Sequence, residues 1–373
     1  MRSRELVSTP PLGVAEKIPV VNAHNEWSKL EEVIVGTPFH LDYQNDESFR
    51  LFFHLNLMKD KNWSVFRGSK PPSNRVRDES LEDLDEFVKI LTARGVIVRR
   101  PQMLTEVRTV RTPFWEAPLA HAMMSRDLFI IIGDELIETA PMVRSRYFEG
   151  DLYKELFTEY FKRGARWTVA PKSRLMDENF DYTFVLKHGY ADPVPEIHAY
   201  EIMFDGAQIL RCGDHLFFNC STDNHRMGAQ WLQRHLGSRY KVVVFELTDN
   251  HIDGLILPLK PGWLLVEEQV ALDSLPEELR KWNVIRYEPY EETTAEASDD
   301  LPLLASQSIG MNVLSLDEDH VVVQDMQHKL IRDLEHAGFT PIPCRWRHGR
   351  TLGGGFHCLT LDIRRQSRLE SYF

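Results

Sequence analysis

The sequence of 373 residues has few cysteines, no excess of basic residues and no long apolar run. No CxxC pair occurs, which argues against a thiolate zinc site, and a disulfide framework does not suit a chain of this size. A net charge of −12 without a basic block argues against nucleic-acid and membrane-surface partners. With no membrane span and no secretory signal at the start, we expect a cytoplasmic protein. The cysteines are Cys212, Cys220, Cys344 and Cys358.

One of these cysteines follows a glycine-rich turn near the C-terminus. Residues 353–358 read Gly-Gly-Gly-Phe-His-Cys, and the apolar run 359–363 directly behind them is typical of a strand. Glycines allow unusual backbone conformations and a close approach of a ligand. Cys358 could therefore be a nucleophile held by backbone dipoles, or a buried structural thiol beside a tight turn.

A repeated pattern organises the rest of the chain. An apolar run, a polar turn and a second apolar run recur four times, each followed by a helical period and a third apolar run. This order predicts strand–strand–helix–strand units. The hairpins are expected at 127–141, 207–221, 254–268 and 312–325, the helices at 151–163, 226–236, 275–282 and 326–337, and the closing strands at 166–169, 241–247, 284–287 and 339–342.

A fifth unit begins the chain but has only one strand before its helix. We expect strands at 29–36 and 95–100 and a helix at 81–93, and the run 359–363 can supply the missing strand. Such pairing would close a ring of five units with few free sheet edges. The alternative is an open α/β sheet with the same elements. We expect a tail over 1–20, one domain over 21–373, and loops or lids at 37–80, 171–200 and 289–301.

Polar residues stand just before the first strand of each unit. In a closed ring these equivalent positions converge on one axis, so their side chains would share a pocket. Taken singly, each residue could merely shape a turn or cap a helix. The residues are Asp127, Asp205, His251, Asp253, Ser306 and Cys358.

This combination suggests a cationic substrate. Carboxylates near a thiol raise its pKa, which is unfavourable for a nucleophile unless the substrate itself carries positive charge. A guanidinium is planar and pairs with carboxylates through two hydrogen bonds. Asp127 and Asp253 could hold such a group and present its central carbon to Cys358. The pattern therefore indicates chemistry on arginine.

Ten stretches distributed along the chain resemble the amidinotransferase family, which includes the arginine:glycine and arginine:inosamine-phosphate enzymes within the guanidino-modifying superfamily. The glycine-rich turn with its cysteine is the most specific of them. The stretches are residues 25–27, 30–36, 125–127, 144–146, 204–207, 231–236, 251–253, 311–314, 352–365 and 370–373.

The resemblance implies an α/β fold, a five-bladed pseudo-symmetric α/β propeller of ββαβ modules. It implies a ping-pong transfer from an L-arginine donor, with release of ornithine, to an acceptor amine, without a metal or cofactor. A homodimer is compatible with it. Carried over by position, Cys358 matches the nucleophile, His251 the general acid/base and Asp205 its partner. Asp127 and Asp253 match the guanidinium-binding pair, and Ser306 a polar residue near the cysteine.

Two positions depart from the glycine-accepting members of the family. Asn250 stands where those members have a methionine, directly before the His-x-Asp motif, and Val270 aligns with their arginine for the donor carboxylate. Asn250 leaves volume and offers an amide, so we expect it to contact an acceptor larger than glycine in a natural-product pathway. The alternatives are a glycine amidinotransferase making guanidinoacetate, an arginine deiminase-like hydrolase, and a non-catalytic binding protein.

Overall fold

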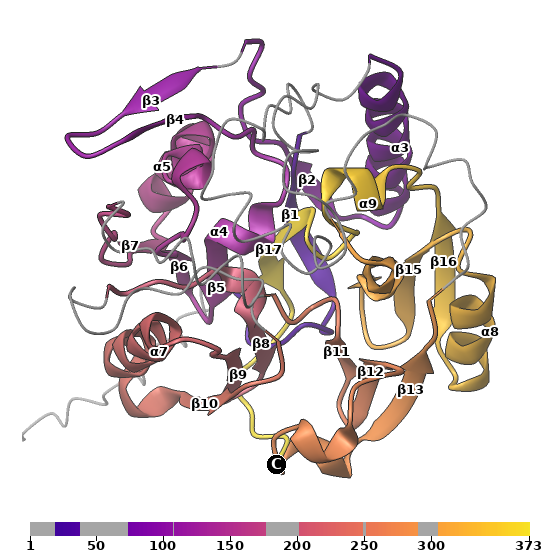
Figure 1. Cartoon of the computed structure of the whole chain (residues 1–373). Helices are drawn as coiled ribbons and strands as arrows, with labels where there is room; N and C mark the ends of the chain where they lie inside the picture. The colour runs from indigo at the N-terminus through magenta and orange to yellow at the C-terminus, as the bar shows by residue number, and fades with distance from the viewer. Residues whose placement is uncertain (1–18, 38–73, 107, 177–200, 249–250, 290–304) are drawn as a thin grey trace, which may run out of the picture.

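The computed structural model describes residues 19–37, 74–106, 108–176, 201–248, 251–289 and 305–373, and these contain five small three-stranded sheets (Figure 1). Each sheet has an antiparallel pair and a third strand parallel to the second. The sheets are β17 (Thr360–Arg365), β1 (Leu30–Val35) and β2 (Ile97–Arg99); β5 (Phe129–Ile132), β6 (Glu135–Glu138) and β7 (Arg166–Val169); β8 (Ile209–Cys212), β9 (His215–Asn219) and β10 (Lys241–Phe245); β11 (Ile256–Lys260), β12 (Trp263–Glu267) and β13 (Asn283–Tyr287); β14 (Leu314–Ser315), β15 (His320–Gln324) and β16 (Thr340–Cys344).

Tight turns explain the antiparallel pairs. Gly133, Gly213 and Gly262 each connect two paired strands and have φ between 60° and 77°, a conformation that glycine adopts without the strain of a Cβ. The hairpins over 127–141, 207–221, 254–268 and 312–325 therefore form where the sequence predicts them. A further hairpin, of β3 (Thr109–Arg111) and β4 (Glu116–Pro118), was not predicted.

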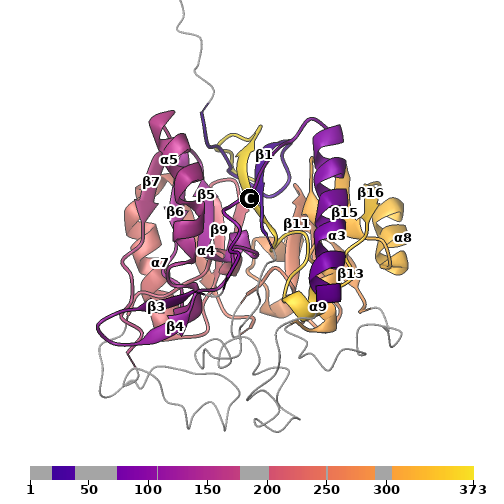
Figure 2. The same cartoon turned by 90° about the horizontal axis from the view of Figure 1, so that it is seen from above.

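Helices connect the second strand of a sheet to the third in four of the five units. Figures 1 and 2 show the four longer helices at the periphery, with strand β1 lying between α3 and α5. The longer helices are α3 (Asn74–Ala93), α5 (Lys154–Lys162), α7 (Asp223–Leu236) and α8 (His328–His336); short ones are α4 (Ser125–Leu128) and α9 (Gly349–Leu352), and the 3-10 turns are η3 (Arg144–Arg146), η4 (Glu149–Tyr153), η6 (Gly206–Gln208), η7 (Gly237–Arg239), η8 (Leu272–Ser274), η9 (Leu279–Lys281) and η11 (Gln307–Met311).

The helix predicted over 275–282 is wrong. The connection between β12 and β13 contains only the 3-10 turns η8 and η9. Pro276 lies between them, and a proline cannot donate the backbone hydrogen bond that a continuous helix needs. The apolar spacing of this segment instead reflects Leu275 and Leu279, which are buried in the core.

Strand β17 pairs with β1, so residues from opposite ends of the described chain share one sheet. Leu30 lies opposite Arg365 and Val35 opposite Thr360.

The division of the chain into a tail over 1–20 and one domain over 21–373 stays a prediction. Residues 1–18 and most of the expected loops 37–80, 171–200 and 289–301 lie outside the described residues, although 74–80 begin α3.

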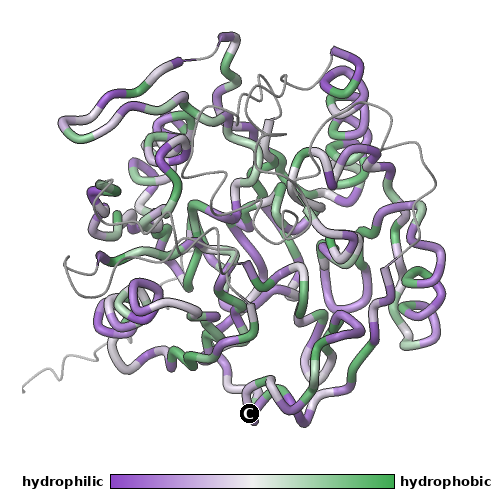
Figure 3. The backbone as a smooth tube through the Cα atoms, viewed as in Figure 1, coloured by the Kyte–Doolittle hydropathy of each residue, from purple (hydrophilic) through white to green (hydrophobic). Residues whose placement is uncertain are grey.

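The core follows the strands. The hydrophobic stretches in Figure 3 lie mainly on the strands, while the outer helices show much hydrophilic colour. All four residues of β5 are buried, as are all four of β8, because both faces of these strands are covered. No helix in the described part of the chain is both long and apolar enough to cross a membrane.

A group of ionised side chains is buried beside β17; we call it the central ion cluster, and it comprises Glu26, Arg126, Arg211, Asp362 and Arg365. Arg211 donates to Glu26 at 2.6 Å and to Asp362 at 2.7 Å, and Arg126 donates to Asp362 at 2.8 Å. Arg365 also donates to Asp362, at 2.8 Å. Buried charges are costly to leave unpaired. The network therefore holds the strands and loops that contain these residues in a fixed relative position.

Candidate active site

Four of the predicted site residues lie just before the first strand of a sheet. Asp127 is in α4 and precedes β5, Asp205 caps η6 ahead of β8, Asp253 precedes β11, and Cys358 precedes β17. Asp205 is held by a capping box with Gln208, whose side chain accepts the Asp205 backbone N–H at 2.8 Å. The three carboxylates and the thiol are all buried, with at most 3% of each residue exposed.

The Cys358 thiol lies against a carboxylate. Its Sγ is 3.2 Å from Asp253 Oδ2, and its backbone N–H donates to Asn312 Oδ1 at 2.9 Å. A Cβ on Gly354 would lie 2.4 Å from Met124 Sδ and 2.8 Å from Cys358 Cβ. The glycines before the cysteine are therefore required by close packing at the thiol.

His251 bridges two of the acids. Its Nε2 is 2.9 Å from Asp205 Oδ2, a hydrogen bond, and its Nδ1 is 3.7 Å from Asp127 Oδ1. Burial disfavours the charged imidazolium, but the negative charges of Asp127 and Asp205 and the Asp205 hydrogen bond outweigh it and raise the pKa of His251 to about 9. At neutral pH this imidazole is protonated and can donate a proton.

Asp127 is shared between the site and a buried arginine. Arg146 Nη1 donates to Asp127 Oδ2 at 2.5 Å, and Arg146 Nε donates to Glu149 at 2.8 Å. Burial raises the pKa of Asp127, while the charges of His251 and Arg146 oppose that rise. Among the described residues, Asp127 Oδ1 and Asp205 Oδ1 are buried without a hydrogen-bond partner. Such oxygens favour a ligand that brings N–H donors.

Asp253 is the carboxylate that lies against the thiol. Its Oδ2 accepts from His357 Nδ1 at 2.8 Å as well as from the Cys358 thiol. Burial works against ionisation, yet the His357 hydrogen bond and charge, with the charge of His251, lower the pKa of Asp253 to about 2. Conversely, burial and the charges of Asp253 and Asp127 raise the pKa of the Cys358 thiol well above its usual value. Without a cationic ligand, the sulfur is a thiol.

Ser306, Val270 and Asn250, the other three positions singled out in the sequence, are not part of these contacts in the described residues. Ser306 is at the exposed start of η11, and among the described residues its side chain makes no hydrogen bond with the other candidates. Val270 is buried in the hydrophobic core, with its carbonyl accepting from Arg286 at 2.7 Å. Asn250 lies outside the described residues. In the described ranges, no group of His, Cys, Asp and Glu has the arrangement of a metal site.

Three residues at the site had no role assigned from the sequence. Asn312 holds the Cys358 backbone, Arg146 holds Asp127, and His357 holds Asp253. All three lie in the family-like stretches, so the sequence signalled their presence. Asn312 and His357, however, have their partners in other units, so these contacts depend on the three-dimensional arrangement, whereas Arg146 and Asp127 belong to the same unit.

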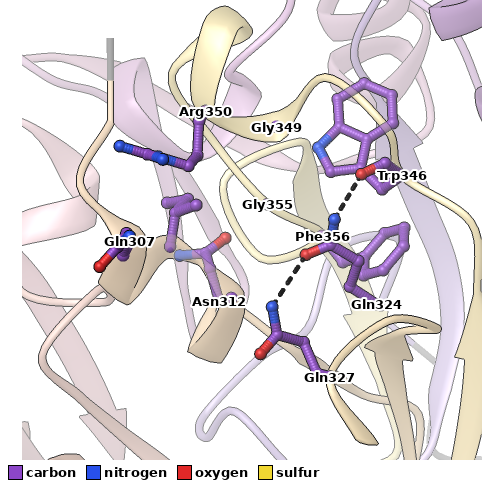
Figure 4. Close-up of a pocket in the computed structure, with 11 residues that line it drawn as sticks. Gln307, Asn312, Gln324, Gln327, Trp346, Gly349, Arg350, Gly355 and Phe356 are labelled. Atoms are coloured by element: carbon purple, nitrogen blue, oxygen red, sulfur yellow. Dashed lines mark hydrogen bonds between the residues drawn. The ribbon is translucent and has the colours of Figure 1, made fainter. Parts of the chain in front are cut away.

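A small polar pocket lies beside the glycine-rich turn (Figure 4). Within it, Gln324 donates to the Trp346 carbonyl at 2.6 Å and Gln327 donates to Gln324 at 3.3 Å. Gly355 also lines it, as does Asn312, which accepts from the Cys358 backbone N–H. The remaining lining residues are Gln307, Ile309, Gly310, Gly349, Arg350 and Phe356.

The carboxylates around His251 give a testable pH dependence. We expect the His251 ring to titrate near pH 9 in NMR spectra of the intact protein, and nearer 6.5 in Asp205→Asn, which removes the hydrogen-bonding anion. Because the pKa of His251 is raised in the folded state, its protonation contributes about 3 kcal/mol to the free energy of unfolding below pH 6.5. This contribution is lost as the pH rises through 9. His24, whose pKa burial lowers to about 4, is the control. A His251 midpoint near 6.5 in the unmodified protein would contradict the expectation.

The known proteins that this chain resembles are amidinotransferases. No family model matches the chain. The L-arginine:L-lysine amidinotransferase of Pseudomonas savastanoi pv. phaseolicola is 36% identical, covering 94% of this chain and 96% of that protein. The mitochondrial glycine amidinotransferase of Xenopus laevis is 34% identical, covering 96% and 86%. The solved inosamine-phosphate amidinotransferase of Streptomyces griseus superposes with a TM-score of 0.83 at 36% identity, covering 95% and 99%.

These relatives define the class of the enzyme as a transferase. The chain belongs to the amidinotransferase family, because relatives above 30% identity are matched over nearly their whole length. The relatives differ in the acceptor that their names record, so the acceptor must be argued from this chain.

Proposed function

We propose that the chain transfers the amidino group of L-arginine, through an amidino-cysteine on Cys358, to an acceptor amine larger than glycine. The observation that carries this is the Cys358 thiol among buried acids, two of which have an unpartnered oxygen. A guanidinium brings planar N–H donors and the positive charge that these groups lack. The arginine donor is also named for the Pseudomonas relative.

The first half-reaction forms the adduct. An arriving guanidinium, bound by Asp127 and Asp253, offsets the negative charge that raises the pKa of the Cys358 thiol, so the thiol loses its proton to solvent and becomes a thiolate. Sulfur attacks the guanidino carbon. The bond from that carbon to the ornithine nitrogen then breaks as the His251 imidazolium protonates this nitrogen, with Asp205 holding the ring. Ornithine leaves and the amidino group stays on sulfur.

The second half-reaction reverses these roles. The acceptor amine attacks the amidino carbon, now neutral His251 takes the proton that the amine loses, and the carbon–sulfur bond breaks. Covalent catalysis divides a difficult exchange between two amines into two easier steps. The chemistry requires no metal or organic cofactor. Ser306 is proposed only as a residue that lines the approach, since it lies at the exposed end of η11.

Three features of the molecule as a whole belong to the same proposal. The five sheets are inferred to be blades of a pseudo-symmetric α/β propeller, which their repeated strand order supports. A cytoplasmic location is inferred because all four cysteines are free. A homodimer also stays a prediction.

The proposed acceptor is an amine intermediate of a natural-product pathway. Asn250 is adjacent in sequence to His251, the group that must take the proton of the acceptor. An amide side chain is shorter than a methionine and offers a hydrogen-bond donor and acceptor. Two bacterial relatives are named for lysine and for inosamine-phosphate, compounds larger than glycine, in keeping with this inference.

A donor–acceptor screen tests the proposal. Arginine is offered with glycine, lysine, longer aminoalkyl compounds or amino-cyclitols, and ornithine and guanidinylated products are detected by mass spectrometry. We expect kcat/KM for one of the larger amines to exceed that for glycine at least tenfold. A tenfold preference for glycine would refute the acceptor assignment. Formation of citrulline without guanidinylated product would refute transfer and favour hydrolysis.

A further inference from the structure

His357 lies between two buried carboxylates, and the mechanism above assigns it no step. Its Nδ1 is 2.8 Å from Asp253 Oδ2, and its Nε2 is 3.5 Å from Glu26 Oε2 in the central ion cluster. An ionised carboxylate can only accept, so Nδ1 carries a proton and donates it to Asp253. His357 thus connects the central ion cluster to the acid that touches the thiol.

We propose that His357 is a positioning residue for the donor half-reaction, holding Asp253 Oδ2 in place between the Cys358 sulfur and the incoming guanidinium. The inference deepens the proposed function and rests on it for the identity of the donor. His357 does not itself contact the reacting atoms in this assignment. It acts through the carboxylate that does.

The main chain of His357 is fixed on both sides. Its N–H donates to the Asn312 carbonyl at 3.2 Å, and its own carbonyl accepts from Arg126 Nε at 2.9 Å. Asn312 also holds the neighbouring Cys358 N–H, and Arg126 belongs to the central ion cluster. These contacts fix the main chain at His357, and the ring itself is buried and bonded to Asp253.

The two ring nitrogens of His357 differ in the closeness of their contacts. Nε2 lies 3.5 Å from Glu26 Oε2, longer than a typical N–H···O hydrogen bond, whereas Nδ1 lies 2.8 Å from Asp253 Oδ2. The side chain is only 4% exposed, so water does not compete for either nitrogen. The closest polar contact of the ring is therefore the one to Asp253.

The contact matters most when the thiol ionises. In the resting site Asp253 Oδ2 accepts from both the Cys358 thiol and the His357 ring. Once sulfur loses its proton, the S–H···O bond is lost and two anions face each other. The His357 N–H still holds Oδ2 at that stage, so the carboxylate keeps its orientation toward the guanidinium nitrogen atoms.

The test compares His357→Leu, which removes the donor, with His357→Asn, which retains an N–H near the Nδ1 position. Two quantities are measured. One is the rate of amidino-adduct formation on Cys358 with arginine alone. The other is the ratio of alkylation rates of the thiol by a haloacetamidine, which is cationic, and a haloacetamide, which is neutral. His24→Leu is the matched control, because His24 is a partly buried ring bonded to Tyr240 at 2.9 Å.

We expect His357→Leu to lower both the adduct rate and the reagent ratio roughly 10- to 100-fold, since a charge-assisted hydrogen bond is lost. His357→Asn should restore most of both, and His24→Leu should leave the ratio unchanged even if its Tm falls. An unchanged ratio in His357→Leu, whether both alkylation rates stay the same or fall equally, would overturn the proposal. If the unmodified protein forms no adduct with arginine, the proposed function fails, while the reagent ratio still decides the role of His357.

Discussion

Replacement of Cys358 by alanine or serine is expected to abolish amidino transfer while leaving the fold intact. The thiol is the nucleophile of the proposed mechanism, and a serine hydroxyl at the same place is a far weaker nucleophile and leaving group beside Asp253. The fold should survive because the Cys358 backbone is held by Asn312 and by the sheet that follows it, not by the sulfur. Intact-mass analysis of the unmodified protein with arginine alone should show one amidino adduct on Cys358.

Cys344→Ser is a suitable control, since Cys344 is a buried thiol at the end of β16. It should lose some stability but keep its ability to form the adduct. Substantial turnover by Cys358→Ser, or an adduct on another residue, would show that the covalent route through Cys358 is wrong.

Asp127→Asn and Asp253→Asn should each reduce donor kcat/KM by roughly 10- to 150-fold. Each substitution removes the charge of a hydrogen-bond acceptor for the guanidinium, a contribution of about 1.5–3 kcal/mol. The loss in stability should be smaller than this. The amide keeps the shape of the side chain and can still accept from Arg146 or His357, the present partners of these acids.

The matched control is Asp317→Asn, which alters a carboxylate bonded to His320 in a surface turn. Its donor kinetics should equal those of the unmodified protein. Steady-state kinetics and thermal midpoints of all three variants provide the comparison. If donor kcat/KM is unchanged in Asp127→Asn and Asp253→Asn, these residues do not bind the guanidinium.

The sequence predicts the sheets well because their signals are local. Apolar runs flanking glycine turns define hairpins such as β5–β6 and β8–β9 without any knowledge of distant residues. The helix expected over 275–282 failed because apolar spacing alone cannot separate a helix from two short turns around Pro276. The β3–β4 hairpin was missed because its strands are three residues each and carry no apolar alternation.

At the site, position within the repeated unit was informative. Asp127, Asp205, His251, Asp253 and Cys358 gather because each stands at the start of a unit. Contacts join His251 to Asp127 and Asp205, and Cys358 to Asp253, and the charges of the first set act on the second. What the sequence could not give is the strength of each acid. The same carboxyl group has a raised pKa at Asp127 and a pKa of about 2 at Asp253, and the difference depends on neighbours from other units.

The pairing of β1 with β17 determines the order in which the molecule can be completed during synthesis. β1 is synthesised before the strands of the other four sheets, and its partner β17 is synthesised after all of them. The three acids and His251 are already available when the glycine-rich turn arrives with Cys358. The thiol therefore joins a prepared set of partners in the same event that completes the first sheet. Such a late, long-range contact is expected to be slow to form and to leave one strand edge exposed in nascent chains.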